Sequence, residues 1–265
     1  MRRAALCFGL AFLWLPVLLL VGYAFSAARL PFTWGGFSLR WFGALLANER
    51  LVEATLLSLR VATGAASLAV LLGGGIGWVL ARHGRFRGRA LFGALAAAPL
   101  VLPEVVTGLS LLLLAVAVQT LTEGWPQRGA GTVLIAHALL AGSYVAVLVQ
   151  ARLASLDPAL EEAARDLGAT PAAVFRTITL PLVAPALAAG WLLGFTLSLD
   201  DVVVASFVSG PAGTTLPIAV FSMLRLGLTP EVNALAALLL LTAAICMGGA
   251  AILLRPRVVA PKAEG

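Results

Sequence analysis

Charged residues are scarce in this sequence. Asp, Glu, Lys and Arg make up only 11% of its 265 residues, whereas 61% are hydrophobic. A soluble globular domain is about a quarter charged and about half apolar. The mean hydropathy of +1.01 therefore argues against a soluble domain, because this much apolar surface has to face lipid. The composition predicts an all-α integral membrane protein.

Lysine is almost absent, since Lys262 is the only one in the sequence. A nucleotide-binding P-loop has the form G-x4-G-K-[ST], in which the lysine reaches the phosphates. No such pattern surrounds Lys262, and the Gly-rich stretch Gly210–Thr215 lacks a lysine. The sequence therefore predicts no ATPase and no catalytic residues in this chain. Any ATP and Mg²⁺ would have to bind to a partner subunit.

Metal-ligating side chains are also few. Cys7 and Cys246 lie in separate apolar runs without metal-ligand spacing, and we expect them to pack rather than to form a disulfide. We expect His137 to be a packed or hydrogen-bonded histidine, because no second His or Cys lies near it in the sequence. The net charge of +6 does not predict a nucleic-acid partner, because most arginines flank apolar segments and so orient the chain in a membrane.

Six apolar windows are long enough to cross a bilayer, which takes about 20 residues. The first is preceded by Arg2 and Arg3 and is longer than the apolar core of a cleaved signal peptide, so we expect a retained anchor rather than a signal peptide. The predicted spans are residues 4–25, 56–80, 90–118, 131–151, 184–207 and 233–254. We expect a kink in the third span at Pro99 and Pro103.

The placement of arginines predicts the orientation of these spans. With the N-terminus in the cytoplasm, 12 of the 18 Lys and Arg residues fall on the cytoplasmic side and 6 on the other side. Lys and Arg favour the cytoplasmic side, so both termini are predicted there. The predicted organisation is a first helix with its external loop (1–53), a transmembrane domain (54–255) and a cytoplasmic tail (256–265).

The longest predicted cytoplasmic segment (153–182) reads as two short helices joined by an elbow. Asp157 is a good N-cap residue, and Gly168 suits a left-handed C-cap. The first helix has an apolar stripe (Leu160, Ala163, Ala164, Leu167) opposite a polar face (Glu161, Glu162, Arg165, Asp166), with Glu161 and Arg165 spaced for an ion pair. Thr170 would cap the second helix, and we expect Pro181 to break the chain before the fifth span. On physical grounds alone, a helix pair lying on lipid headgroups remains an alternative.

The spacing within this segment is distinctive. It reads Glu162-Ala163-Ala164, three residues, Gly168, nine residues, then Ile178-Thr179-Leu180-Pro181. This resembles the "EAA" loop of ATP-binding cassette (ABC) importer permeases, with the pattern E-A-A-x3-G-x9-I-x-L-P. The resemblance implies the type I permease fold, in which this loop forms the coupling helices that dock onto a cytoplasmic ATPase. It implies that Glu161, Glu162, Ala163, Ala164 and Gly168 form the ATPase contact, with Ile178 and Pro181 fixing the second arm.

Ionisable residues inside membrane spans are rare and are functional candidates. Three carboxylates occupy such positions: Glu104 in the third span, and Asp200 and Asp201 in the fifth. At 1.5 Å per residue, Glu104 and Asp200 lie at similar depths, so they are candidates for a path taken by a cation. The alternatives are that some are protonated, or that they pair with Arg60 or with a partner subunit.

The stretch from Ser198 to Ala236 resembles the corresponding region of spermidine/putrescine permeases of the PotC type. In it, we expect a short helix from Pro217 to Leu226. This resemblance implies an inner-membrane importer that works with an ABC ATPase dimer, a second PotB-like permease and a periplasmic binding protein. Three alternatives remain: the same machinery for another small solute such as an aminophosphonate, an ion-coupled secondary transporter, and a structural membrane subunit without a pathway.

Overall fold

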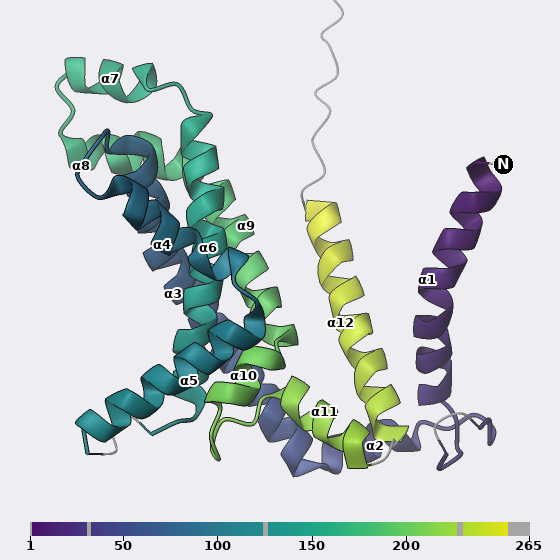
Figure 1. The fold of residues 1–265 in the computed structure, drawn as a ribbon. Helices are drawn as coiled ribbons and strands as arrows, with labels where there is room; N and C mark the ends of the chain where they lie inside the picture. The colour runs from purple at the N-terminus through teal and green to yellow at the C-terminus, as the bar shows by residue number, and fades with distance from the viewer. Residues whose placement is uncertain (1, 31–32, 124–126, 227–229, 254–265) are drawn as a thin grey trace, which may run out of the picture. The chain divides into compact units, whose positions relative to one another are not determined.

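The computed structural model describes residues 2–30, 33–123, 127–226 and 230–253, which are helical with short connections and include no β-strand (Figure 1). The helices are α1 (Arg2–Ala24), α2 (Arg40–Ala47), α3 (Glu49–Arg82), α4 (Arg89–Val101), α5 (Glu104–Leu121), α6 (Ala130–Ala154), α7 (Ala159–Asp166), α8 (Pro171–Val174), the π-helical turn η1 (Phe175–Thr179), α9 (Leu180–Asp200), α10 (Val203–Val208), α11 (Leu216–Leu226) and α12 (Pro230–Leu253). The all-α prediction is confirmed for this part of the chain. The predicted tail lies outside it.

Five helical stretches within the described residues are long and apolar enough to cross a membrane. They are Ala5–Ala24, Glu49–Arg82, Glu104–Leu121, Ala130–Ala154 and Pro171–Asp200. Two shorter apolar helices, Arg89–Val101 and Pro230–Thr242, fall in the third and sixth predicted spans. The expected short helix after Pro217 is also confirmed, as α11.

Two predicted spans are interrupted, so the prediction of single continuous helices was wrong for them. The third span breaks at Leu102 and Pro103, where α4 ends and α5 turns away in a new direction (Figure 1). Pro103 lacks the N–H that would continue the helix, so the expected kink is a complete break. The fifth span ends at Asp200, and a short helix, α10, begins after Asp201 and Val202.

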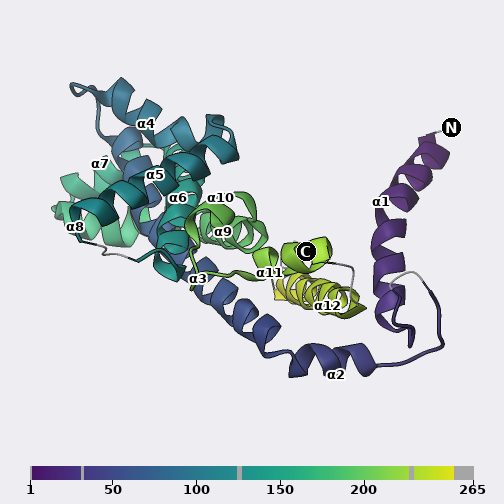
Figure 2. The same ribbon diagram turned by 60° about the horizontal axis from the view of Figure 1, so that its bottom comes forward.

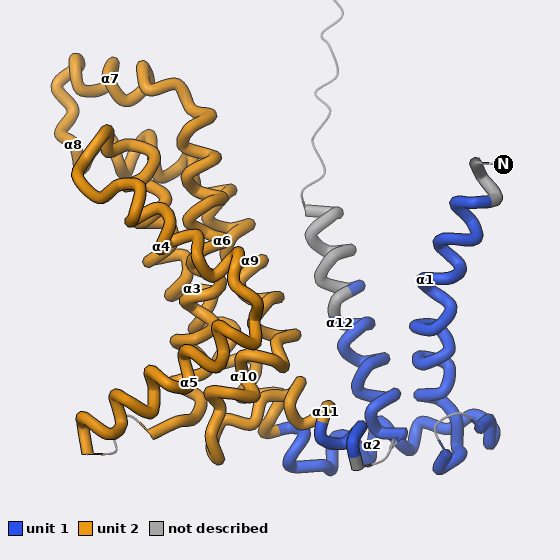
Figure 3. The backbone as a smooth tube through the Cα atoms, in the orientation of Figure 1, with its two compact units in different colours: residues 1–52, 222–265 blue, residues 53–221 orange. Residues whose placement is uncertain are grey.

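The chain divides into two compact units (Figure 3). In the smaller unit, residues 1–52 and 222–265, α12 packs against α1 and α2. Asn48 just after α2 donates its side-chain amide to Glu231 in the first turn of α12, at 3.1 Å. This contact ties the start of α12 to the end of α2.

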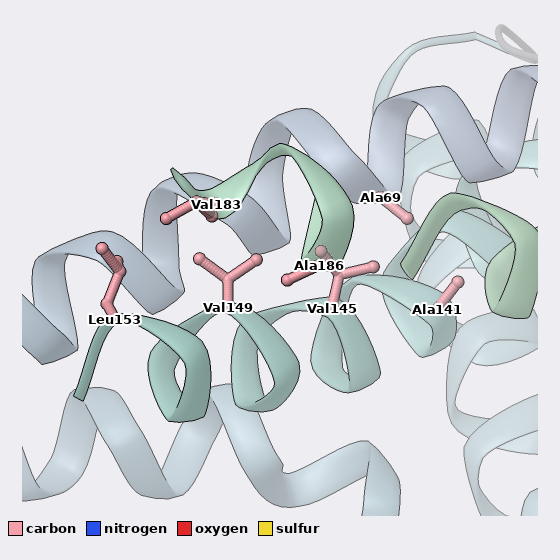
Figure 4. Packing of buried hydrophobic residues seen from close by; sticks show 7 residues of the cluster. All are labelled: Ala69, Ala141, Val145, Val149, Leu153, Val183 and Ala186. Carbon is pink, nitrogen blue, oxygen red and sulfur yellow. The ribbon is translucent and has the colours of Figure 1, made fainter. Parts of the chain in front are cut away.

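The larger unit, residues 53–221, has its core where α3, α6 and α9 meet (Figure 4). Four core residues on α6 recur every fourth position and so form one stripe along that helix. The core side chains are Ala69 from α3, Ala141, Val145, Val149 and Leu153 from α6, and Val183 and Ala186 from α9. Because the alanines are small, the helices approach closely along this stripe.

Two glycines set the crossing of α3 and α6. A Cβ atom at Gly73 would collide with the main-chain oxygen of Gly142, and one at Gly77 with that of Ala146. Their four-residue spacing is the small-xxx-small pattern of closely packed membrane helices. The two positions hold the backbones of α3 and α6 in direct contact.

Candidate functional site

The segment from Asp157 to Thr170 forms the expected helix and elbow. Asp157 Oδ1 accepts the N–H of Ala159 at 2.9 Å, and Thr170 Oγ1 accepts that of Ala173 at 3.3 Å. Gly168 has φ of +86°, a left-handed conformation that costs little only for glycine. Here α7 and α8 lie side by side at one end of the larger unit (Figures 1 and 2).

Glu161 is buried and anchors α7 to the rest of the larger unit. Its side chain accepts a bond from Arg82 Nε at 3.1 Å, at the end of α3, and from Thr179 Oγ1 at 3.0 Å, in η1. Arg165 lies 3.5 Å away on the next turn of α7, which confirms the predicted ion pair. The part of the polar face that carries Glu161 is thus directed into the larger unit, where Arg82 and Thr179 supply its partners.

The remaining face of α7 is left uncovered in this chain. Leu160 is 50% exposed and Leu167 is 89% exposed, and Glu162 and Ala163 are exposed beside them. An apolar face of this kind can be covered by another protein or can lie against lipid headgroups. The apolar stripe predicted from the sequence is thus directed away from the helix's own protein, with Ala164 half-buried at its edge.

The second arm runs into the membrane without a break. Leu180 donates its N–H to the oxygen of Phe175, five residues back, in the π-helical turn. Pro181 follows in the first turn of α9, and the π-helical bond just before it lets the helix continue past the missing N–H. The predicted chain break at Pro181 was therefore wrong. Ile178 is half-buried, and the Phe175 ring makes an edge contact with Trp78 of α3 at 6.0 Å.

The three carboxylates expected in the membrane line one cavity. Glu104 from the start of α5, Asp200 from the end of α9 and Asp201 from the following break all face a space of about 380 Å³. The lining also includes His137 and Tyr144 from α6. The structure brings these groups together from three helices, and Glu104 and Asp200 are exposed to the cavity side.

Asp201 differs from the other two carboxylates because it is fully engaged within the protein. Its oxygens accept the N–H groups of Val204 at 3.2 Å and Ala205 at 2.7 Å, at the start of α10. Oδ2 also lies 2.9 Å from Nε2 of His137, whose Nδ1 lies 2.6 Å from the hydroxyl of Ser198. Asp201 therefore caps α10 and ties the helix break to α6.

His137 has the role expected for it, a buried hydrogen-bonded histidine, with 3% of its surface exposed. No cluster of three or more His, Cys, Asp or Glu side chains within the described ranges is arranged to hold a metal ion. Asp200 and Glu104 are the carboxylates left open to the cavity, and carboxylate oxygens can accept charge-assisted hydrogen bonds from an organic cation.

Sequence reasoning missed several residues of both sites. Arg82 and Thr179 lie 79 and 18 residues from Glu161, and Ser198 and Tyr144 carry no charge that would mark them. One signal was present in the sequence. Arg82 ends the second predicted span on the same side of the membrane as the segment 153–182, which carries more carboxylates than arginines.

The chain matches the family model described as "Binding-protein-dependent transport system inner membrane component" over residues 73–259. It is 52% identical over 240 residues to the putrescine transport system permease protein PotI of Escherichia coli (strain K12), covering 90% of this chain and 85% of that protein. It is 39% identical over 240 residues to the spermidine/putrescine transport system permease protein PotC of Haemophilus influenzae, covering 91% of each.

Solved structures show the same fold. One chain of a bacterial ABC transporter involved in the import of the acidic polysaccharide alginate superposes with a TM-score of 0.69 at 16% identity, covering 96% of this chain and 95% of that chain. A chain of the MetNI methionine ABC transporter in an inward-facing conformation gives a TM-score of 0.61 at 18% identity, covering 77% and 93%. The match to the family model, the extent of the identities and the shared fold establish that this chain belongs to the binding-protein-dependent transport system inner membrane components, the permease family of ABC importers.

Proposed function

We propose that this chain is a permease subunit of an ABC importer for polyamines, with both termini in the cytoplasm and six spans of the membrane. The observation that carries the proposal is the cavity in which Glu104 and Asp200 lie together, with no arginine or lysine among the described residues that line it. A protonated polyamine carries two or more ammonium groups, which such a cavity would bind. The similarity to PotI makes putrescine the first substrate to test.

Transport in this proposal is driven through α7 and α8. The uncovered face of α7 docks on a cytoplasmic ABC ATPase dimer, which binds the ATP and Mg²⁺. Glu162, Ala163 and Gly168 lie at this contact, and Leu160 and Leu167 supply its apolar part. Glu161 keeps its charge inside the permease and transmits the movement of α7 to α3 through Arg82.

A continuous helical path joins α8, which lies beside the docking face of α7, to the cavity. Pro171–Asp200 is one stretch of 30 residues, about 45 Å long at 1.5 Å per residue. Asp200 is its last residue, so a swing of α8 on the ATPase moves a carboxylate of the cavity directly. Rigid-body movement of this kind is a common way to convert closure of a partner into alternating access.

Three further partners complete the machine: a second, PotB-like permease, a periplasmic binding protein that delivers the polyamine, and the membrane lipid around the spans. Glu104 and Asp200 hold the ammonium groups during passage. Asp201 maintains the helix break, with its charge satisfied by His137 and by the amides of α10.

The test is ATP-dependent uptake of labelled putrescine into vesicles that contain this chain with its ATPase, second permease and binding protein. Asp200→Asn and Glu104→Gln should each lower uptake about tenfold or more, the effect of losing one charge-assisted bond of about 1.4 kcal/mol. Assembly and ATP hydrolysis should remain. Glu53→Gln, an exposed carboxylate outside the cavity, is the matched control.

Three results would contradict parts of the proposal. No uptake of putrescine or spermidine by a complex that assembles and hydrolyses ATP would remove polyamines as the substrate, and another small solute such as an aminophosphonate would be tested next. Normal uptake in both cavity variants would show that these carboxylates do not bind the transported cation. Uptake driven by an ion gradient in the absence of ATP would instead support a secondary transporter.

A further inference from the structure

A second cavity, of about 530 Å³, lies where α4 packs against α6 near the end of α3. It is at the same end of the larger unit as α7, since the last residue of α3, Arg82, bonds Glu161. The lining residues are Leu80, Arg85, Phe86, Arg89, Ala90, Gly93, Ala96, Ala97, Ala146, Val147 and Gln150.

The charge in this cavity is positive and uncompensated. Arg85 and Arg89 line it, and none of the described lining residues is a carboxylate. The sequence has no Asp or Glu between Glu53 and Glu104, so no acid lies nearby along the chain. Arg82, the neighbouring arginine, is paired with Glu161 and therefore does not need a ligand. The remaining arginines favour an anion.

The guanidinium of Arg89 is held in place but not satisfied. Its Nη2 donates to the main-chain oxygen of Leu80 at 2.7 Å, which fixes the group against the end of α3. Its Nε is buried and has no hydrogen-bond partner among the described residues. A buried donor without an acceptor is unfavourable and uncommon in proteins. An anion in the cavity that Arg89 lines would compensate the charge of this guanidinium.

The backbone at this position also favours an anion. Arg89 is the first residue of α4, and Gly88 before it has φ of +86° and gives no side-chain cap. The first N–H groups of a helix lack partners within the helix and attract negative charge. The positive charge of the arginines and the N–H groups at the start of α4 therefore both favour binding of an anion.

The rest of the cavity is an apolar groove. Ala90, Gly93 and Ala97 lie on one face of α4, opposite Ala146 and Val147 of α6. Their small side chains leave an open channel that runs about 10 Å along α4, at 1.5 Å per residue. A free inorganic anion would leave this channel unused. A hydrocarbon chain attached to the anion would fill it.

We infer that this cavity binds an anionic phospholipid, with the phosphate held by Arg85 and Arg89 and one acyl chain lying between α4 and α6. Basic pockets between membrane helices are typical sites for anionic headgroups. Gln150, half-buried in the lining, adds an amide donor beside the phosphate. The bound lipid covers the groove and compensates the charge of the two arginines.

The test uses the full-length chain in nanodiscs of phosphatidylethanolamine and phosphatidylglycerol in equal amounts, with native mass spectrometry to count retained lipids. The wild-type chain should retain phosphatidylglycerol preferentially. R85Q/R89Q should lower this preference about 25-fold, since each arginine near anionic headgroups contributes about fivefold. R87Q is the matched control, because Arg87 is exposed in the same loop and does not line the cavity.

A second variant guards against misfolding of the arginine double variant. Gly93→Leu keeps both charges and fills the groove, and a Cβ at Gly93 would meet only Leu80 Cδ2, at 3.7 Å. It should lose retained phosphatidylglycerol while the chain remains folded by circular dichroism.

Three outcomes would overturn the inference. One is equal retention of the two lipids by the wild-type chain, and another is an R87Q loss as large as that of R85Q/R89Q. The third is displacement of the bound lipid by millimolar inorganic phosphate, with Gly93→Leu unaffected, which would mean a site for free phosphate instead. None of these depends on transport, so failure of the lipid site and failure of the polyamine proposal are distinguishable.

Discussion

The attachment of α7 to the permease depends on one buried carboxylate, and replacing it tests how the docking segment is held. In Glu161→Gln the side chain keeps its shape and can still accept a bond from the Thr179 hydroxyl. It loses its charge, so Arg82 is left without a counter-ion. The side chains of Arg82 and Glu161 are only 15% and 11% exposed, so water can compensate this loss only in part.

The structure gives the size of the effect. Breaking a fully buried ion pair costs about 3–5 kcal/mol, and breaking an exposed one costs about 0–1 kcal/mol. A pair with this degree of exposure lies between these limits, at about 2 kcal/mol. The additional pair with Arg165, which is 53% exposed, contributes about 0.3–0.5 kcal/mol. The loss should appear as local opening of α7, since this helix can detach while the core of α3, α6 and α9 remains folded.

The assay is amide hydrogen exchange of residues 161–169 in the full-length chain, followed by mass spectrometry. A change of about 2 kcal/mol in the opening free energy predicts exchange about 30-fold faster in this segment. Arg82→Gln should give a similar increase. The effect of the double variant on the opening free energy should be smaller than the sum of the two single effects, because the two residues form one interaction. Glu162→Gln is the control, because Glu162 is exposed beside Glu161.

The reasoning is refuted if Glu161→Gln changes exchange less than threefold, or if α7 in the wild-type chain already exchanges at the rate of an unprotected peptide. In the assembled transporter we expect the variant to hydrolyse ATP while uptake falls, because movement of a loosened α7 no longer reaches α3.

Three further predictions concern positions where backbone or charge is constrained. Gly168→Val should cost about 1–2 kcal/mol locally because φ of +86° is unfavourable for a branched side chain; uptake per ATP hydrolysed should fall, and normal uptake would contradict the coupling role of the elbow. Gly77→Leu should prevent the close approach of α3 and α6 and so lower the yield of folded chain in size-exclusion chromatography. Gly75→Ala, with open space at its Cβ, should instead raise the thermal midpoint, through a stability gain of about 0.5–1 kcal/mol. Asp201→Asn should lower thermal stability by about 1–2 kcal/mol through the loss of charge-assisted bonds, and Asp200→Asn should leave stability unchanged while lowering uptake; the reverse pattern would exchange the structural and binding roles of the two residues.

The sequence predicted where the long helices of this protein lie better than it predicted where they are interrupted. Apolar runs identified the positions of the long helices, because a segment that faces lipid must satisfy its backbone within the helix. The caps at Asp157 and Thr170 and the left-handed Gly168 were also predicted correctly, since caps depend on residues a few positions apart. Pro181 was misjudged, because a π-helical turn just before a proline lets the helix continue without the missing N–H.

At the candidate sites, patterns among neighbouring residues in the sequence were not sufficient to assign roles. The three carboxylates were recognised as unusual for a membrane segment, and their depth suggested that they lie near one another. Which of them is open and which is structural followed only from the partner of Asp201, a histidine 64 residues away. The direction in which Glu161 points could not be read from an eight-residue helix, because its partner Arg82 lies 79 residues away in the chain.

The sequence by itself determined that the chain is a membrane protein, where its long helices run and that it carries the coupling pattern of an ABC permease. Composition and short-range spacing are sufficient for these, because they depend on contacts with lipid and between neighbouring residues. Tertiary structure alone decided that Glu161 is an internal anchor, that Asp201 holds a helix break, and that Arg85 and Arg89 line a groove without an acid. Each of these depends on residues that are distant in the chain and become neighbours only when α3, α4, α6 and α9 pack together.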